Sequence, residues 1–285
     1  MAVDFVTYTQ RRWTGGIRFI DGLFQTHLDP GPGAVVRSVD AGFSIEKIRL
    51  LLVSHSHPDH CCDASVFLEG MTHGMTKHRG SLIAATSVLS GNEYSEAAIS
   101  KYHQSLMSNV FEAHPGDHYQ VEGIGVQVVK ALHTDPDGVG FVLEFPGVGK
   151  IGYMSDTAYF DGIVDPYRGM KLLILCTTRP REAPLKGHLT TDDAAIIVGS
   201  SEPEMAVLTH FGMRLLNDSP SAQAKYVQDS TGIQTVAAFD RMVVTLEKSI
   251  KVTSLENRKQ NIWRRDRARR EPTSSVGFRK GNTGF

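Results

Sequence analysis

Residues 54–60 read SHSHPDH, a stretch that places three imidazoles and one carboxylate within six positions: His55, His57, His60 and Asp59. The apolar run IRLLLV (48–53) precedes it and predicts a buried strand. Side chains two residues apart on extended backbone point to the same side, so the first two histidines can face one ion together. A proline then ends the strand and places the last two donors at the start of the next helix. This donor set is typical of zinc, with manganese or iron as alternatives.

Three further donors each end an apolar run downstream. His133 ends VQVVKALH, Asp156 ends KIGYMSD, and His210 ends EMAVLTH. Strand ends that meet at one edge are where α/β sheets place their sites, so we expect these side chains to join the first group. Four residues cannot complete the coordination of two ions, whereas the combined set of seven can.

In this order the residues resemble the metal motifs of the metallo-β-lactamase superfamily. The resemblance covers about residues 12–248, and the upstream LDPGPG (28–33) is similar to the first motif of that family. It implies an α/β (α+β) fold, a four-layer αββα sandwich of two mixed sheets with the site at one sheet edge.

The resemblance also implies two divalent metal ions and a role for each donor. One ion would take His55, His57 and His133; the second would take Asp59, His60 and His210; and Asp156 would bridge them. Asp29 of the LDPGPG segment would orient the 54–60 loop rather than bind metal.

The segment KGHLTTDDAAIIV (186–198), followed by LTHFGMR (208–214), is similar to the phosphodiesterase branch of the family. That branch includes tRNA 3′-processing endonucleases and cyclic phosphodiesterases, which carry a histidine before Ser/Thr and ahead of a helix. His188 stands at that position. The resemblance implies that a metal-bridging hydroxide attacks the phosphodiester while His188 protonates the leaving group as general acid. Asp59 either serves only as a ligand or also accepts the proton of the attacking water.

Two other functions stay open. A hydrolase of a carboxylic ester, lactone or thioester would use the same dinuclear site, and a pocket without arginine would favour it. A module of another class would keep the fold and recruit RNA or a partner through a basic tail. We expect a small-molecule phosphodiester or a short nucleotide as substrate rather than tRNA. Only 22 residues separate His133 from Asp156, which leaves no room there for the arm of the tRNA-processing relatives.

Length and charge predict one hydrolase domain, residues 1–250, and a flexible basic tail, residues 251–285. Residues 256–285 hold nine Lys or Arg and three Asp or Glu, whereas residues 1–255 carry a net charge of −7. An acidic body is not typical of a general nucleic-acid binder. The three cysteines, with no run apolar enough for a membrane span or secretory signal, predict a cytoplasmic protein without membrane contact. The oligomeric state stays open, with a homodimer as one alternative.

Periodicity and turn residues predict the other elements. Further strands are expected at 16–20, 81–85, 126–132, 140–145, 150–154, 171–176, 204–209 and 243–246, and helices after His60, over 93–107, from near Thr190 and over 219–231.

Overall fold

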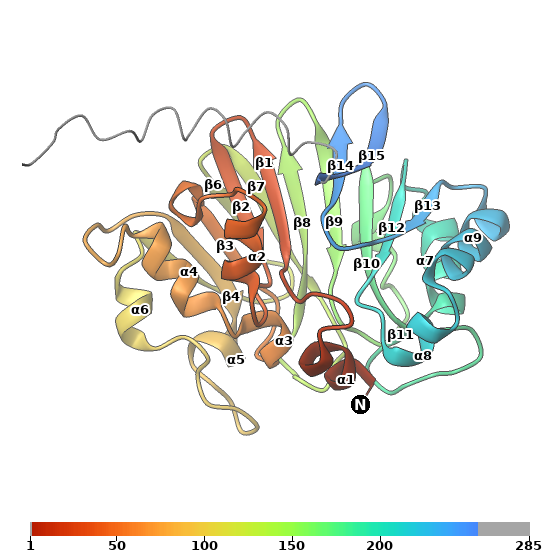
Figure 1. The fold of residues 1–285 in the computed structure, drawn as a ribbon, viewed down its shortest axis with the longest axis horizontal. Coiled ribbons are helices and arrows are strands. Elements are labelled where there is room, and N and C mark those ends of the chain that lie inside the picture. The colour runs from red at the N-terminus through yellow and green to blue at the C-terminus, as the bar shows by residue number, and fades with distance from the viewer. Residues whose placement is uncertain (1, 256–285) are drawn as a thin grey trace, which may run out of the picture.

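Two β-sheets packed face to face form the centre of the molecule (Figure 1). The computed structural model describes the backbone of residues 2–255 and the side chains of residues 5–255. The expected basic tail, residues 256–285, lies outside the described residues. Within residues 2–255, no helix combines the length and apolar character needed to cross a membrane.

The first sheet has five strands in the spatial order β1-β2-β3-β4-β5. They are β1 (Ile17–Asp21), β2 (Phe24–Leu28), β3 (Leu50–Val53), β4 (Ser81–Ala85) and β5 (Asn109–Ala113). The β1–β2 pair is antiparallel and the other pairs are parallel, so the sheet is mixed.

The second sheet follows the order β13-β12-β10-β9-β8-β7-β6, and a short strand, β11, pairs with β10. Its strands are β6 (His118–Val121), β7 (Ile124–Lys130), β8 (Val139–Phe145), β9 (Gly149–Met154), β10 (Leu172–Arg179), β11 (Leu189–Thr190), β12 (Ala206–Thr209) and β13 (Thr235–Ala237). A separate antiparallel hairpin joins β14 (Met242–Leu246) to β15 (Ile250–Ser254).

Helices flank the sheets on both outer sides (Figure 1). They are α1 (Ala2–Thr9), α2 (Ala34–Asp40), α3 (Pro58–Cys61), α4 (Ala64–Met71), α5 (Thr86–Leu89), α6 (Lys101–Ser105), α7 (Thr191–Ser201), α8 (Met213–Asn217) and α9 (Pro220–Thr231), with 3-10 turns at Ile45–Lys47 and Asp165–Tyr167. On one side α4 contacts β3, and on the other α7 packs on β10 and α9. The expected four-layer sandwich is confirmed.

The first five residues of strand β10, Leu172 to Cys176, form a continuous apolar run. Leu172 and Ile174 belong to a core that includes side chains of both sheets, whereas Leu173 and Leu175 belong to a second core with α7 and α9. Successive side chains of a strand point to opposite faces, and both faces of this sheet are covered. A continuous apolar run is therefore what the strand needs.

Two expectations about the elements need correction. The helix expected over 93–107 is confined to α6, because Asn92 Oδ1 accepts hydrogen bonds from the backbone N–H groups of Tyr94 and Ser95 and holds the preceding segment in a turn. The helix then begins only after Ser100, whose side chain caps it. At the other end, β15 continues to Ser254, so the described fold extends past the boundary expected at residue 250.

The loop between β2 and α2 carries the LDPGPG segment and packs directly against α3. A Cβ built on Gly31 would lie 2.0 Å from the backbone oxygen of Asp59 and 2.7 Å from that of Thr14. No side chain fits between these carbonyl groups. Gly31 therefore lets the loop approach the segment that carries two of the expected ligands.

We predict that Gly31→Ala destabilises the fold by about 3 kcal/mol, because backbone rather than a movable side chain blocks the added methyl group. Gly33→Ala is the matched control in the same loop. Gly33 has a φ of +85° and no atom within 4 Å of an added Cβ, so its cost is only the left-handed conformation, about 1 kcal/mol. Urea unfolding of both variants checks the difference, and equal losses would contradict the packing argument.

Candidate metal centre

The expected ligands follow strands that end at the same edge of the sandwich. Strands β7, β9 and β12 run in one direction, because β7 and β9 are each antiparallel to β8 while β9 and β12 are each parallel to β10. His133, Asp156 and His210 follow their carboxyl ends, and residues 55–60 follow β3 of the other sheet. The structure brings all seven predicted ligands into overlapping groups whose donor atoms lie within 4.8 Å of one another.

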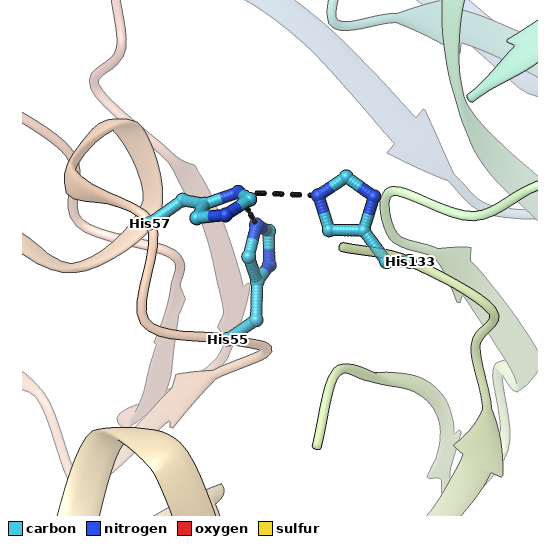
Figure 2. A group of neighbouring side chains, drawn as sticks. All are labelled: His55, His57 and His133. Carbon is cyan, nitrogen blue, oxygen red and sulfur yellow. Dashed lines mark hydrogen bonds between the residues drawn. The ribbon is translucent and has the colours of Figure 1, made fainter. Parts of the chain in front are cut away.

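Three histidines form the first group. His57 Nδ1 lies 3.1 Å from His55 Nε2 and 3.1 Å from His133 Nε2, and the three rings point toward one another (Figure 2). Two of these residues come from the loop after β3, and His133 reaches them from the second sheet.

Asp59, His60 and His210 form the second group. His210 Nε2 lies 3.0 Å from His60 Nε2 and 3.2 Å from Asp59 Oδ2. The side chain of His60 is 3% exposed, whereas those of Asp59 and His210 are 11% and 13% exposed, so this group opens to solvent on one side.

Asp156 lies between the two groups. Its Oδ2 is 3.6 Å from His60 Nε2 and 3.8 Å from His133 Nε2, and its Oδ1 is 3.3 Å from His210 Nδ1. Oδ1 is buried and accepts no hydrogen bond from any described residue. A carboxylate in this place, with an unsatisfied buried oxygen, fits a metal ion.

The nitrogen–nitrogen distances fit the same interpretation. Two neutral imidazole nitrogens whose lone pairs face each other repel unless a proton or a cation lies between them. Zinc–nitrogen bonds of 2.0–2.1 Å in a tetrahedral site would place two ligand nitrogens about 3.3 Å apart, close to the spacing found in both groups. The His and Asp donor set is therefore arranged for divalent metal.

The ionisation states also suit metal binding, which needs neutral imidazoles and charged carboxylates. Burial lowers the pKa of His55 well below its usual range, with a further contribution from His60, and burial likewise lowers the pKa of His133. Burial opposes charge on Asp59, yet His60 and His210 hold the pKa of its carboxyl at about 2. Burial also opposes charge on His60, but the carboxylates around it raise the pKa of that imidazole. The carboxylates thus require positive charge at this position, which a proton or a metal ion can supply.

Asp29 sets the proton positions of two ligands. Its Oδ2 accepts hydrogen bonds from His60 Nδ1 (2.9 Å) and from the hydroxyl of Ser54 (2.7 Å). Since the Ser54 hydroxyl donates to Asp29, its oxygen accepts the Nδ1 proton of His55 at 2.9 Å. Both histidines are thereby protonated on Nδ1 and present the lone pair of Nε2 to the site. The role implied for Asp29 agrees with these contacts.

His133 is oriented in the same way by a backbone group. Its Nδ1 donates to the carbonyl oxygen of Gly187 at 2.8 Å, which leaves Nε2 free for a ligand role. A φ of +77° at Gly187 and the 3.1 Å between an added Cβ and His133 Nδ1 explain why glycine stands there.

His188 lies closer to the ligands than its sequence context suggests. It pairs with Leu185 in an isolated β-bridge directly ahead of β11, and α7 begins at Thr191, close to the helix start expected near Thr190. Its Nδ1 lies 3.8 Å from Asp156 Oδ2, and its ring contacts that of His133 edge-on. These distances alone therefore do not show whether His188 is a metal ligand or only a neighbour of the ligands.

Sequence reasoning missed three supporting residues. Asp135 is buried and accepts hydrogen bonds from Ser56 and Ser87, which holds the metal-binding loop to α5. Thr178 lies between His188 and His210, 3.3 and 3.2 Å from their Nδ1 atoms. Tyr153 donates a hydrogen bond from its hydroxyl to Asp29. Asp135 could have been found in the sequence because it follows His133 by two residues. Thr178 and Tyr153 lie within strands, and no sequence pattern marks them.

Comparisons with known proteins agree with this geometry. A family model described as the β-lactamase superfamily domain matches residues 26–211. An uncharacterized protein of Methanocaldococcus jannaschii is 36% identical over 236 residues, which cover 82% of this chain and 88% of that protein. The metallo-β-lactamase fold protein YhfI from Bacillus subtilis has a similar structure, with a TM-score of 0.66, 16% identity, and coverage of 81% of this chain and 91% of YhfI. A diphosphatase of the PhnP family gives a TM-score of 0.62 at 16% identity, with coverage of 84% and 85%.

We predict that Asp29→Asn weakens metal binding by roughly 10- to 100-fold. The amide has one acceptor oxygen, so it cannot accept both at Oδ1, from the backbone N–H of Ser54, and at Oδ2, from His60 and the Ser54 hydroxyl. Tyr153→Phe is the matched control, since it removes one hydrogen bond of Asp29 but leaves both histidine tautomers fixed. Competition with a chromogenic chelator measures the affinity of each variant. If Asp29→Asn holds metal as tightly as the unmodified protein, Asp29 does not set the ligand tautomers.

Proposed function

The chain belongs to the metallo-β-lactamase superfamily, and within this family we propose that it is a dinuclear metal-dependent phosphodiesterase. The observation that carries the proposal is one cluster at a sheet edge that unites seven His and Asp donors with an additional histidine, His188. Zinc is the proposed ion, with manganese or iron as alternatives, because the donors are imidazoles and carboxylates.

Bound divalent ions supply Lewis-acid activation of water and of phosphoryl oxygens. The two groups would each hold one ion, and Asp156 would contact both. Thr178 keeps the rings of His188 and His210 in place through its hydroxyl. Asp59 stays ionised at neutral pH, which suits a metal ligand, while a pKa of about 2 makes its carboxylate a weak acceptor for a proton from water.

His188 favours an anionic substrate. Burial lowers the pKa of His188 to about 4, so its ring is neutral near pH 7 and holds no proton to give to an alkoxide. A negatively charged phosphoryl group in contact with the ring would raise that pKa and charge the imidazole. A neutral ester would not. General-acid action by His188 therefore requires a contact that charges its imidazole, and a substrate phosphoryl group is the proposed one.

The surroundings also support a phosphodiester. Arginine side chains line the cavity beside His60 together with carboxylates, whereas a pocket without arginine would favour neutral esters. The diphosphatase of the PhnP family, which has a similar structure, indicates that this fold accommodates the hydrolysis of diphosphates. Strands β8 and β9 occupy most of the chain between His133 and Asp156, so we propose a small phosphodiester or short nucleotide rather than tRNA.

We predict about two divalent ions per chain by elemental analysis, together with hydrolysis of bis(p-nitrophenyl) phosphate by the same sample. His55→Ala should lower both quantities. His103→Ala, which removes a histidine bonded to Glu69 far from the ligand groups, should change neither. Two bound ions without turnover would contradict the proposed phosphodiesterase activity and leave esters, lactones and thioesters as candidate substrates. A protein that takes up no metal on reconstitution would contradict the proposed dinuclear site.

We predict that His188→Ala slows cleavage of thymidylyl-(3′→5′)-thymidine by roughly 10²- to 10⁴-fold, the usual contribution of a general acid. Bis(p-nitrophenyl) phosphate should lose much less, because p-nitrophenolate leaves without needing a proton. His118→Ala, at an exposed histidine on β6, is the control for both substrates. Equal losses on the two substrates would argue against proton donation, and loss of bound metal would make His188 a ligand.

A further inference from the structure

Residues 54–57 alternate serine with histidine, and the serines bind carboxylates while the histidines face the first ligand group (Figure 2). Asp29 accepts hydrogen bonds from the backbone N–H and from the hydroxyl of Ser54, both at 2.7 Å. Asp135 accepts the same two kinds of hydrogen bond from Ser56, at 2.9 and 2.8 Å. A buried carboxylate thus holds the backbone immediately before each of the two histidines.

Asp135 is a buried carboxylate that only neutral groups surround. It is 5% exposed and forms no ion pair with any side chain that the structure describes. Its Oδ2 accepts from Ser56 and, at 2.6 Å, from the hydroxyl of Ser87 in α5. Its Oδ1 accepts from the backbone N–H of Asp137 at 3.1 Å and from Asn92 Nδ2 at 3.5 Å. Hydrogen bonds of this number let a carboxylate stay charged in the interior. Three separate segments of the chain therefore meet at one side chain.

Asp135 belongs to the loop that also carries the third ligand of the first group, His133. The backbone N–H of Gly138 donates to the carbonyl oxygen of Asp135 at 3.1 Å and closes this loop. A Cβ built on Gly138 would lie 3.7 Å from the Cβ of His55 and 3.8 Å from that of His133, so the loop packs against both ligands. The hydrogen bonds from Ser56 to Asp135 thus join the two segments that supply the first ligand group.

The carboxylate of Asp135 is tied to the first ligand group alone. Within the described chain it forms no hydrogen bond with a member of the second group. Asp29 differs in this respect. It accepts a hydrogen bond from His60 of the second group and, through Ser54, fixes the tautomer of His55 in the first. One carboxylate therefore supports both groups, and the other supports only the first.

We propose that Asp135 is a positioning residue for one of the two metal ions, the ion bound by His55, His57 and His133. It is not a member of any group of potential metal donors among the described residues. By holding Ser56 to the His133 loop, it sets how far apart the ligand nitrogens lie, 3.1 Å on either side of His57 Nδ1. Hydrogen bonds behind metal ligands orient them and raise their affinity for the ion. The inference rests on the proposed dinuclear site and is independent of which ester the protein cleaves.

The affinity of each ion, measured separately, tests the proposal. Cadmium NMR of the loaded protein should show one resonance for each of two ions. His133→Ala removes a ligand of the first group only, so it identifies the resonance of the first ion. Competition with a chelator, followed at both resonances, then gives two affinities. Asp135→Ala should weaken the first ion roughly 10- to 100-fold, and the second by much less, through the shared Asp156 alone.

Two control variants separate positioning from a general structural role. Asp135→Asn should recover most of the lost affinity, because its amide oxygen can still accept from Ser56. Ser87→Ala removes the hydrogen bond from α5 to the same carboxylate oxygen and leaves both contacts of Ser56 in place. It should lower the resistance of the fold to urea without changing the relative affinity of the two ions.

Three results would overturn the inference. They are an equal loss at both ions in Asp135→Ala, a loss in Asp135→Asn as large as that in Asp135→Ala, and a loss specific to the first ion in Ser87→Ala. If Asp135→Ala does not fold, Ser56→Ala takes its place, because it removes one of the two hydrogen bonds and keeps the backbone contact. It should weaken the first ion more than the second, and unchanged affinities would overturn the inference.

These measurements also separate the inference from the proposed function. Preferential loss of the first ion in Asp135→Ala supports the inference whether or not the protein hydrolyses a phosphodiester. Equal loss of both ions overturns the inference and leaves the dinuclear site in place. An unmodified protein that binds no ion overturns both.

Discussion

The carboxylate of Asp29 is the contact on which the rest of the site depends. It follows β2 and accepts hydrogen bonds from Ser54 after β3, from His60 in α3 and from Tyr153 of the second sheet. A charge buried this deeply is stable only when donors surround it, and these donors come from both sheets. The same contacts that offset the cost of burying Asp29 decide which nitrogen of His55 and of His60 faces the candidate metal site. Fold stability and metal binding therefore share one set of hydrogen bonds.

The candidate metal ligands were recognisable in the sequence because each follows the end of an apolar strand, directly or within one short loop. Strand ends are visible as a change of residue type, and parallel strands bring such ends together at one edge. His133, Asp156 and His210 were identified in this way. The apolar run at the start of β10, Leu172 to Cys176, likewise indicated a strand buried on both faces.

The supporting contacts were not predictable, because they join residues that are far apart in the sequence and that no local sequence pattern connects. Asp135 and Ser56 are 79 residues apart, and Thr178 reaches His210 across 32 residues. The helix expected over 93–107 failed for a different reason: the side chain of Asn92 competes with the backbone for its own hydrogen bonds.

Ligands drawn from both sheets have a consequence for the mechanics of the chain. An ion shared by His57 and His133 would tie together residues 76 positions apart, and one shared by His60 and His210 would close a loop of 150 positions. Such an ion is a reversible crosslink, and closing long loops in the unfolded chain removes conformational entropy much as a disulfide does. Because the ion binds the folded form, the free energy of unfolding would rise with the concentration of free ion.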